Sequence, residues 1–447
     1  MHYTSPGFVF LVVAVVWLAV GVVTKDRSPR WHWYTTGYPL TWARISWSWR
    51  PLCIERGLAI SRTAGRVRIG DMMVQGQDLR PVVPRFWIGR PTPTGLTVRV
   101  RLLPGQTPEL YAQASEALMH AWRVHGVRVL SKSRGTVAIE VFTSDPLAGV
   151  IMLDPAHDPV LAEGPADRPV LALLAGVTER GTSFIVNLRL LPHWLIVGAT
   201  RSGKSTLVHA IVSRLAPQYV ILLGIDLKFG MELSVYAPRL SGLAITRREA
   251  VDMLSGLLDR AFERMEACRR EGVRAAWELK DPPPPVVVLV DEIAELYLVT
   301  NPRDREEIAL RDQAATLLLR LAQLGAAVDI HLIISGQRFG ADLGQGATAL
   351  RAQLGGRICL HVNDPESAVM VLGDIWPTAV AVAQMISVEQ RGTLVAADGN
   401  GGWVRARAMF VDASDAADIA RRTARLTPVL EGIALPEYAG AGGGDAR

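Results

Sequence analysis

The hydrophobic and polar positions of the chain fall into successive patterns of different kinds. The first is an unbroken apolar run, FVFLVVAVVWLAVGVVT, over residues 8–24, which carries no charge. Its length is at the short end of what a helix needs to cross a hydrocarbon core about 30 Å thick. The run therefore predicts a transmembrane anchor within residues 1–24.

Charges beside this run set its expected orientation. Lys25, Arg27 and Arg30 follow the apolar residues, whereas a cleaved signal peptide carries its positive charges before them. We therefore expect a retained single-pass anchor at the cell membrane, with the bulk of the chain in the cytoplasm. Residues 25–85 are basic and include the run WHWYTTGYPLTWARISWSWRPL, a mixture of aromatic and arginine residues typical of a segment that lies at the lipid headgroups.

Short alternating runs occupy residues 86–148. Apolar residues recur every four positions from Leu110 to Trp122 and predict one buried helical face. The strands expected from alternation are LTVRVRL (96–102), VRVLS (127–131) and TVAIEVF (136–142). We expect a small βαββ domain with a structural or oligomer-forming role, because it contains no catalytic constellation.

Longer apolar runs separated by helical stretches fill residues 149–427, and a tail rich in Gly and Ala follows at 428–447. Runs that are apolar at nearly every position are typical of strands buried on both faces of a parallel sheet. Those expected here are LIV (195–197), VILLGI (220–225), VVVLV (286–290) and IHLIIS (330–335). The pattern predicts an α/β fold for this larger domain.

Composition limits the class of protein. A chain of 447 residues with 49% hydrophobic content can form two or three domains with sizeable cores. Its three cysteines lie far apart, which indicates neither a disulfide framework nor a zinc site. Residues 25–135 carry 18 Lys and Arg against 6 Asp and Glu. Such a basic region suits anionic lipid, nucleic acid or a merely solvated surface.

Candidate chemistry appears where the strand at 195–197 ends. Residues 198–205 read GATRSGKS and fit the phosphate-binding pattern G-x4-G-K-[ST] between a strand and a helix. In this motif backbone N–H groups surround the phosphates, the lysine neutralises their charge and the serine hydroxyl ligates Mg²⁺. The residues expected to bind ATP are Gly198, Ala199, Thr200, Arg201, Ser202, Gly203, Lys204, Ser205 and Thr206.

Residues at the ends of two other strands complete the expected site. Asp291 is expected to hold Mg²⁺ together with the P-loop serine, and Glu292 to orient and polarise the attacking water. Gln337 is expected to sense the γ-phosphate or to place water. Arg338 and Arg357 are candidates for a charge donated into a neighbouring subunit's site, and a plain surface position is equally open for each.

Beyond these motifs, residues from about 86 to about 412 resemble the FtsK/SpoIIIE-type DNA translocases, closest to the actinobacterial conjugal transfer (Tra/TraB-like) proteins. The segments MELSVY and IHLIISGQR are more specific than a P-loop, because generic ATPases lack them. The stretches that carry the likeness are PHWLIVGATRSGKS (192–205), MELSVYAPRL (231–240), VVVLVDEIAEL (286–296), RLAQLGAAVDIHLIISGQR (320–338) and LRAQLGGRICLHVNDPESAVMVLG (350–373).

This resemblance implies a RecA-like P-loop ATPase that assembles as a membrane-tethered hexameric ring around double-stranded DNA and threads it by ATP hydrolysis. Arg357 falls where a trans-acting arginine would lie. The loop 339–356, with Arg351, falls where phosphate contacts independent of DNA sequence would lie. The residues that would keep their family roles are Lys204, Ser205, Asp291, Glu292 and Gln337.

Two positions depart from the family pattern. Phe339 stands where a proline usually follows the Gln-Arg pair, which affects the expected path of the loop. After Val411 only about 36 residues follow, whereas a winged-helix DNA reader needs about 60 or more. We therefore expect any choice of DNA sequence to come from a separate recognition protein.

Several functions remain open on the sequence alone. Transfer of plasmid DNA in conjugation is favoured by the single expected span and the missing orienting domain, both of which disfavour a chromosome segregation motor. The FtsK-like ATPase of a type VII protein secretion system is an alternative, although such chains generally join several ATPase modules and this one has a single P-loop. A regulator that uses ATP as a switch has no need of Glu292.

Overall fold

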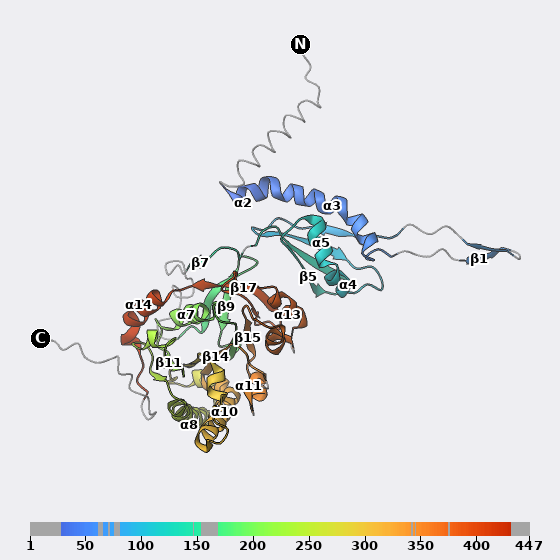
Figure 1. Cartoon of the computed structure of the whole chain (residues 1–447). Coiled ribbons are helices and arrows are strands. Elements are labelled where there is room, and N and C mark those ends of the chain that lie inside the picture. The colour runs from blue at the N-terminus through green and yellow to red at the C-terminus, as the bar shows by residue number, and fades with distance from the viewer. Residues whose placement is uncertain are drawn as a thin grey trace, which may run out of the picture. The chain divides into compact units, whose positions relative to one another are not determined.

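The computed structural model describes residues 28–60, 66–69, 72–75, 81–145, 147–152, 169–340, 343, 344, 346–373 and 376–430. The chain divides into two compact units, Met1–Pro146 and Leu147–Arg447, which are treated separately below (Figure 1). The predicted anchor at residues 8–24 lies outside the described residues. Within the described ranges, every helix is too short or too polar to cross a bilayer.

The first unit is built on a four-stranded antiparallel sheet in the order β3-β4-β6-β5. Its strands are β3 (Phe86–Ile88), β4 (Gly95–Arg101), β5 (Gly126–Ser133) and β6 (Thr136–Phe142). The predicted helix is two short helices, α4 (Pro108–Gln113) and α5 (Ser115–Trp122). The sheet also has one strand, β3, that the expected βαββ pattern lacks.

One face of this sheet is covered and the other is not. Leu96, Val98 and Val100 of β4 alternate inward and pack with buried side chains of α4 and α5, among them Leu118 and Trp122. Strand side chains point alternately to opposite faces, so the residues between them point away from the helices. The helices therefore pack on the side of the sheet to which the alternate apolar residues of β4 point.

The aromatic segment before this sheet forms α2 (Pro29–His32), the π-helical turn η1 (Trp33–Gly37) and α3 (Tyr38–Glu55). The sequence predicted that this whole segment lies at the lipid headgroups, but part of it is buried in the protein. Its indole groups at Trp33 and Trp49 donate hydrogen bonds to the carbonyls of Thr92 (2.7 Å) and Pro84 (2.8 Å), and both rings are buried in the core of the small domain. Part of the region 25–85 is therefore a structural layer of that domain.

The opposite side of the same segment stays exposed. Trp31, Trp42 and Trp47 are 69%, 49% and 82% exposed. The remainder of the region includes a two-stranded ribbon formed by β1 (Arg66–Ile69) and β2 (Met72–Gln75). One side of the aromatic segment therefore packs in the protein core, and the other side is exposed.

The second unit contains a large mixed sheet in the order β12-β11-β13-β14-β10-β15-β16-β17-β8-β9, with β7 beside β17. The strands from β12 to β15 run parallel, and β16, β17, β8 and β9 extend the sheet in antiparallel pairs. Their bounds are β7 (Ile151–Met152), β8 (Ala172–Thr178), β9 (Ser183–Asn187), β10 (His193–Val197), β11 (Ile221–Ile225), β12 (Gly242–Ala244), β13 (Val286–Val290), β14 (Ile330–Gly336), β15 (Gly356–Cys359), β16 (Thr393–Ala397) and β17 (Trp403–Phe410).

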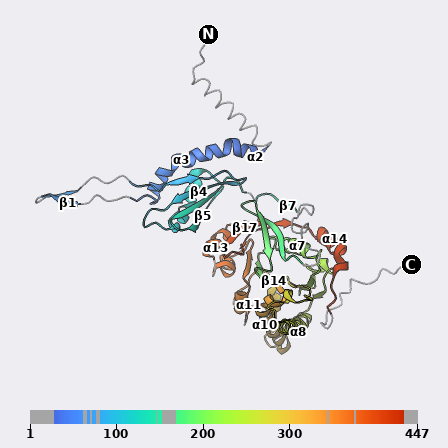
Figure 2. The same cartoon turned by 180° about the vertical axis from the view of Figure 1, so that it is seen from behind.

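Helices cover both faces of this sheet (Figures 1 and 2). One face packs on α8 (Arg247–Glu271), α10 (Arg305–Leu324), α11 (Ala347–Gln353) and α13 (Pro377–Gln384). The other face packs on α7 (Lys204–Leu215) and α14 (Ala413–Thr423). Each of the four apolar runs expected to form strands lies within or overlaps a strand of the parallel half. Burial on both faces explains why these runs show no alternation.

Candidate nucleotide-binding site

The P-loop joins the end of β10 to the start of α7, and a glycine is required at its last turn. Gly203 has φ 102°, and a Cβ added there would lie 2.5 Å from the main-chain nitrogen of Gly392. That nitrogen donates a hydrogen bond to the carbonyl of Ser202 (2.8 Å). The loop is therefore held against the turn before β16 by a contact that only a residue without a side chain permits.

The first residues of the P-loop are tied to two neighbouring strands. The Gly198 N–H donates to the Gly336 carbonyl at the end of β14 (3.1 Å), and the Ala199 N–H donates to the His361 carbonyl after β15 (2.8 Å). The loop therefore lies between the carboxyl ends of parallel strands and leads directly into the N-terminus of α7. That is the arrangement that binds phosphate groups.

The two predicted carboxylates lie opposite the P-loop. Asp291 and Glu292 follow β13 and are buried, with 8% and 7% exposure. The Lys204 ammonium lies 3.3 Å from the Asp291 carbonyl and 3.4 Å from Glu292 Oε2. Burial raises the pKa of the Asp291 carboxyl, and the nearby Lys204 charge opposes that rise. The structure thus places Lys204 beside the two predicted acidic residues, although Lys204 and Asp291 lie 87 positions apart in the chain; their roles toward ATP and Mg²⁺ stay predictions.

A second lysine also reaches these carboxylates. The Lys228 ammonium lies 3.8 Å from Asp291 Oδ2 and 3.7 Å from Glu292 Oε2. It is placed by Asp226, a fully buried carboxylate that accepts the Lys228 N–H at 3.1 Å. The sequence analysis assigned no role to either residue.

Glu232 is a site residue that the sequence analysis missed. Its carboxylate accepts a 2.9 Å hydrogen bond from the Ser205 hydroxyl, and its N–H donates to Asp226 at 2.8 Å. The available signal was the segment MELSVYAPRL, which was noticed only as a mark of the family. The fold explains the segment, because it lies beside the helix that the P-loop begins.

The same segment contacts α7 at two further points. The Tyr236 hydroxyl lies 2.5 Å from His209 Nδ1, four residues along each element from the Ser205–Glu232 pair. The buried Arg239 guanidinium donates to the carbonyls of Ala216, just after α7, and of Gln218 and Val220 (2.8, 2.7 and 2.9 Å). Residues four apart share a helix face, so the segment follows α7 from its first turn to its end.

Gln337 enters the site through its main chain. Its N–H donates to Glu292 Oε1 at 3.2 Å, and the residue lines the same cavity as the P-loop. This contact fixes the orientation of the Glu292 carboxylate. The expected place of Gln337 at the strand end agrees with the structure, and its role toward the γ-phosphate stays a prediction.

The role predicted for Arg357 is corrected by its position in the fold. It lies on β15 inside the sheet, 5% exposed, and its guanidinium donates to the carbonyls of Leu354, Val371 and Arg351 (3.2, 2.8 and 3.1 Å). A side chain buried and bonded to its own chain cannot extend into a neighbouring subunit without breaking these bonds. Its placement fits a structural role, not the trans-acting role that the sequence suggested.

The loop expected to contact DNA includes a short helix among its described residues. It contains α11, and Arg351 near the end of this helix donates to the Met370 carbonyl at 3.0 Å. Phe339 is 1% exposed and packs edge-on against Tyr297, with ring centroids 6.5 Å apart. The residue that replaces the expected proline therefore anchors the start of the loop in the core.

A cavity of about 660 Å³ joins these groups. One wall comes from the P-loop with Lys228, Glu232, Asp291 and Gln337. The other comes from the turn before β16 and from β7 and β17, with Glu389, Arg391, Gly392, Arg407, Phe410, Val150 and Ile151 among its residues. A hydroxyl, carboxylates and a lysine around a phosphate-binding loop are the donor set that suits Mg²⁺ with a nucleoside triphosphate.

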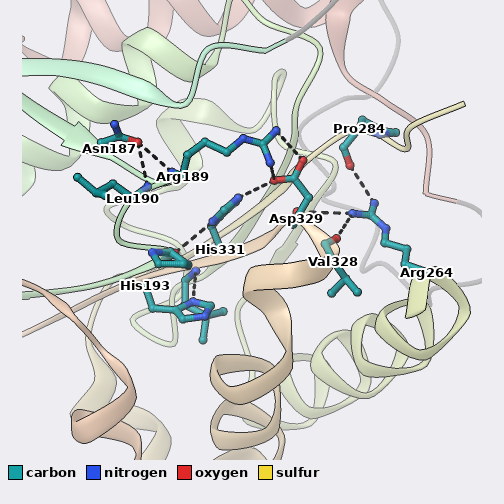
Figure 3. Close-up of polar contacts among 11 residues, drawn as sticks. Asn187, Arg189, Leu190, His193, Arg264, Pro284, Val328, Asp329 and His331 are labelled. Atoms are coloured by element: carbon teal, nitrogen blue, oxygen red, sulfur yellow. Dashed lines mark hydrogen bonds and ion pairs between the residues drawn. The ribbon is translucent and has the colours of Figure 1, made fainter. Parts of the chain in front are cut away.

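A polar network holds the opposite ends of the central strands. Asp329, just before β14, accepts a bidentate ion pair from Arg189 (2.7 and 2.9 Å) and lies 2.9 Å from His331 Nε2 (Figure 3). Next to it, His193 Nδ1 accepts the Leu332 N–H at 3.2 Å. Burial, with the nearby His331, lowers the pKa of His193 to about 3. This network fixes β10 against β14 at the end away from the P-loop.

Sequence comparisons match both parts of the chain to known families. The actinomycete conjugal transfer protein N-terminal domain matches residues 18–143, and the FtsK/SpoIIIE family matches residues 160–277 and 273–341. The transfer protein TraSA of Streptomyces ambofaciens is 39% identical over 392 residues, which cover 85% of this chain and 91% of that protein. A sporulation regulatory protein of Streptomyces azureus is 43% identical over 270 residues, 60% of this chain and 88% of that one.

More distant relatives include much longer proteins. The DNA translocase FtsK of Bacillus cereus is 28% identical over 279 residues, 58% of this chain, and this chain matches 33% of its length. Among solved structures, the pCW3 conjugation coupling protein TcpA with ATPγS shares the fold with a TM-score of 0.56 at 21% identity, over 77% of this chain and 93% of that one. The fold is thus that of RecA-like P-loop ATPases.

Proposed function

This chain belongs to the FtsK/SpoIIIE family, with the N-terminal domain of actinomycete conjugal transfer proteins, and we propose that it is a membrane-anchored, ATP-driven translocase that moves double-stranded plasmid DNA between cells in conjugation. The observation that carries the proposal is the convergence of the P-loop, Asp291 and Gln337 on one cavity, with Glu292 in contact with Gln337 beside it. A relative that matches 85% of the chain is named as a transfer protein.

The roles proposed for the side chains follow from their positions. Lys204 and the N–H groups at the start of α7 would bind the β- and γ-phosphates. Ser205 and Asp291 would hold Mg²⁺, which when bound neutralises phosphate charge. Glu292, oriented by the Gln337 N–H at 3.2 Å, would polarise the attacking water. Hydrolysis is part of the proposal because the buried Glu292 carboxylate lies beside the P-loop, 3.4 Å from the Lys204 ammonium.

The proposed membrane attachment is supported by the apolar run in the sequence and by the exposed tryptophans of the aromatic segment. The apolar run at 8–24 would anchor the chain, and the exposed indoles of Trp31, Trp42 and Trp47 suit the interface between lipid and water that follows such a helix. The bulk of the chain would then lie in the cytoplasm. A hexameric ring around DNA and a separate DNA-recognition protein are further parts of the proposal, by analogy with the family.

Other functions have weaker support. A chromosome segregation motor and a type VII secretion ATPase would use the same nucleotide site, but the relative that matches 85% of this chain is named as a transfer protein, and residues 18–143 match the N-terminal domain of actinomycete conjugal transfer proteins. The match to a sporulation regulatory protein keeps an ATP-dependent regulator as a second candidate, since it is 43% identical. Glu292 distinguishes the two, because a switch that only binds ATP has no use for a water-polarising carboxylate.

The deciding experiment is the ATPase rate of the full chain in detergent, with and without long linear double-stranded DNA. We expect a several-fold stimulation that grows with DNA length and falls with salt, and none with Lys204→Ala. Plasmid transfer from donor cells that carry the same variant should be lost. A rate indifferent to DNA, together with normal transfer by the Lys204→Ala donor, would reject the translocase.

A further inference from the structure

Among the described residues of the small domain, no helix covers the second face of the sheet. Thr97, Arg99 and Arg101 of β4 point away from α4 and α5, since the alternate residues Leu96, Val98 and Val100 are buried beneath those helices. Arg99 and Arg101 are exposed. In Figure 2 the strands β4 and β5 are seen from this uncovered side.

Arginines gather on this face in β4 and at the two ends of β3. Arg101 donates its N–H to the Arg85 carbonyl at 2.9 Å, which places these two residues side by side on neighbouring strands. Arg99 lies opposite Trp87, whose ring is 55% exposed. Arg90, Arg99 and Trp87 also line a hollow of about 380 Å³. The four residues Arg85, Arg90, Arg99 and Arg101 are called the arginine face below.

The charge of the arginine face is uncompensated. Among the described residues, none of its four guanidinium groups has a carboxylate within ion-pair distance or an acceptor within hydrogen-bond distance. Glu140 is the single carboxylate on the outward side of these strands, and it stands opposite Arg128 in the sheet register. A folded domain gains little stability from like charges on neighbouring strands, so their presence calls for an anionic partner.

We propose that the arginine face binds the phosphate backbone of duplex DNA, as a contact separate from the motor. The inference rests on the proposed function for the identity of the substrate. Outward residues two apart on a strand are about 6.8 Å apart, about twice the axial rise per phosphate of one DNA strand. Arginine suits this partner because its planar guanidinium can bind phosphate through two hydrogen bonds.

The geometry of the domain favours DNA over lipid. α3 packs by Ile45 and Trp49 against the helix-covered side of the sheet, and its exposed Trp42 and Trp47 face away from that core. If these indoles meet the membrane, the arginine face lies on the other side of the same domain and faces away from the bilayer. Four of the 18 Lys and Arg residues in the region 25–135 then have a defined location and a proposed partner.

The test compares two pairs of arginines in the full chain. The variant Arg99→Ala with Arg101→Ala removes two charges from the arginine face. Its control, Arg50→Ala with Arg56→Ala, removes two exposed charges from α3 and its end. Binding to a fluorescent 30-base-pair duplex is followed by anisotropy between about 50 and 250 mM salt, because phosphate contacts set the salt dependence.

We expect the first variant to bind DNA about 10- to 100-fold more weakly, and its salt slope to fall by nearly 2, at about 0.9 per lost contact. The control should match the unmodified chain, and ATPase without DNA should be unchanged in both. Equal DNA binding by variant and control would overturn the inference. Two further results for the variant would also overturn the inference. Unchanged DNA binding with weaker binding to phosphatidylglycerol vesicles would show that the face binds lipid. Unchanged DNA binding with a changed oligomeric state would show that the face binds a second copy of the chain.

Failure of this inference can be told apart from failure of the proposed function. If the unmodified chain binds DNA and is stimulated by it, but the Arg99 and Arg101 variant behaves like the control, only the arginine face is rejected. If the unmodified chain neither binds DNA nor responds to it, the translocase itself is rejected, and the arginine face with it.

Discussion

The Ser205 hydroxyl donates a 2.9 Å hydrogen bond to the Glu232 carboxylate, which links the first turn of α7 to the segment after β11. The donated proton leaves the lone pairs of the Ser205 oxygen free. A serine oriented in this way can ligate Mg²⁺ without first rotating, and a carboxylate behind a metal ligand strengthens that ligand. Glu232 thus acts on the site through Ser205.

Replacing Glu232 by Gln should weaken Mg²⁺-dependent nucleotide binding. Loss of a carboxylate behind a metal ligand typically costs about 10- to 100-fold in metal affinity. The measurement is the Mg²⁺ concentration that half-saturates binding of a fluorescent ATP analogue to the full chain. Glu263→Gln on the exposed side of α8 is the control. An unshifted Mg²⁺ requirement in Glu232→Gln would show that the hydrogen bond to Ser205 has no part in metal binding.

Glu292→Gln should bind ATP and turn it over slowly. The amide oxygen can still accept the Gln337 N–H, so the geometry is kept while the charge that polarises water is lost. A general base contributes about 10²- to 10⁴-fold, which is the expected fall in turnover. ATP affinity and hydrolysis rate are measured on the same preparation, with Lys204→Ala as the blank. Turnover equal to that of the unmodified chain would remove Glu292 from the chemistry.

Asp329→Asn should destabilise the motor domain without touching the nucleotide site. Asn tolerates the positive φ of 59° at this position, so the backbone is kept and the ion pair with Arg189 is lost. Arg189 is 33% exposed and solvent screens part of the pair, so we expect a loss of about 1–3 kcal/mol in the free energy of unfolding.

Thermal unfolding of the full chain measures this loss. The control is Asp312→Asn, which removes the exposed pair with Arg311 and should change stability by less than about 0.5 kcal/mol. Equal midpoints for the two variants would mean that the network around Asp329 is not a source of stability.

His193 should make the protein less stable in acid. Its pKa is lowered to about 3 in the fold, so between about pH 6.5 and pH 3 the unfolded chain binds a proton that the folded chain excludes. His193 therefore does not lower the free energy of unfolding above pH 6.5. As the pH falls from 6.5 toward 3, the free energy of unfolding decreases by at most about 1.4 kcal/mol per pH unit because of this group. His193→Gln keeps an acceptor for the Leu332 N–H and removes this titration.

The check is the thermal midpoint of the His193→Gln variant and the unmodified chain at pH 7 and pH 5. The unmodified chain should lose more stability than the variant on acidification, because only it gains a proton at this site on unfolding. Parallel losses in the two proteins would show that His193 does not contribute to acid sensitivity.

Local patterns in the sequence determined much of the fold and the centre of the site. Uniformly apolar runs predicted the central strands of the motor, and the spacing in GATRSGKS placed Lys204 and Ser205 at the start of a helix. Asp291 and Glu292 were predictable because parallel strands end on one edge of a sheet, which brings distant strand ends together. These inferences needed only periodicity and the chain order of a few residue types.

Tertiary packing decided the remainder. Glu232 and Tyr236 became partners of Ser205 and His209 because an irregular segment lies along α7, and no local spacing encodes that contact. Arg357 was expected at a subunit boundary, yet its strand lies inside the sheet, where its guanidinium serves main-chain carbonyls.

The aromatic segment is a second case in which the sequence did not predict which neighbours a side chain contacts. Composition predicted a headgroup surface for Trp33 and Trp49, but the small sheet needed a third helix over its apolar side and buried both rings. A sequence states which side chains are apolar or charged. Which neighbour each one meets depends on strand order and helix placement, and only the folded chain fixes these.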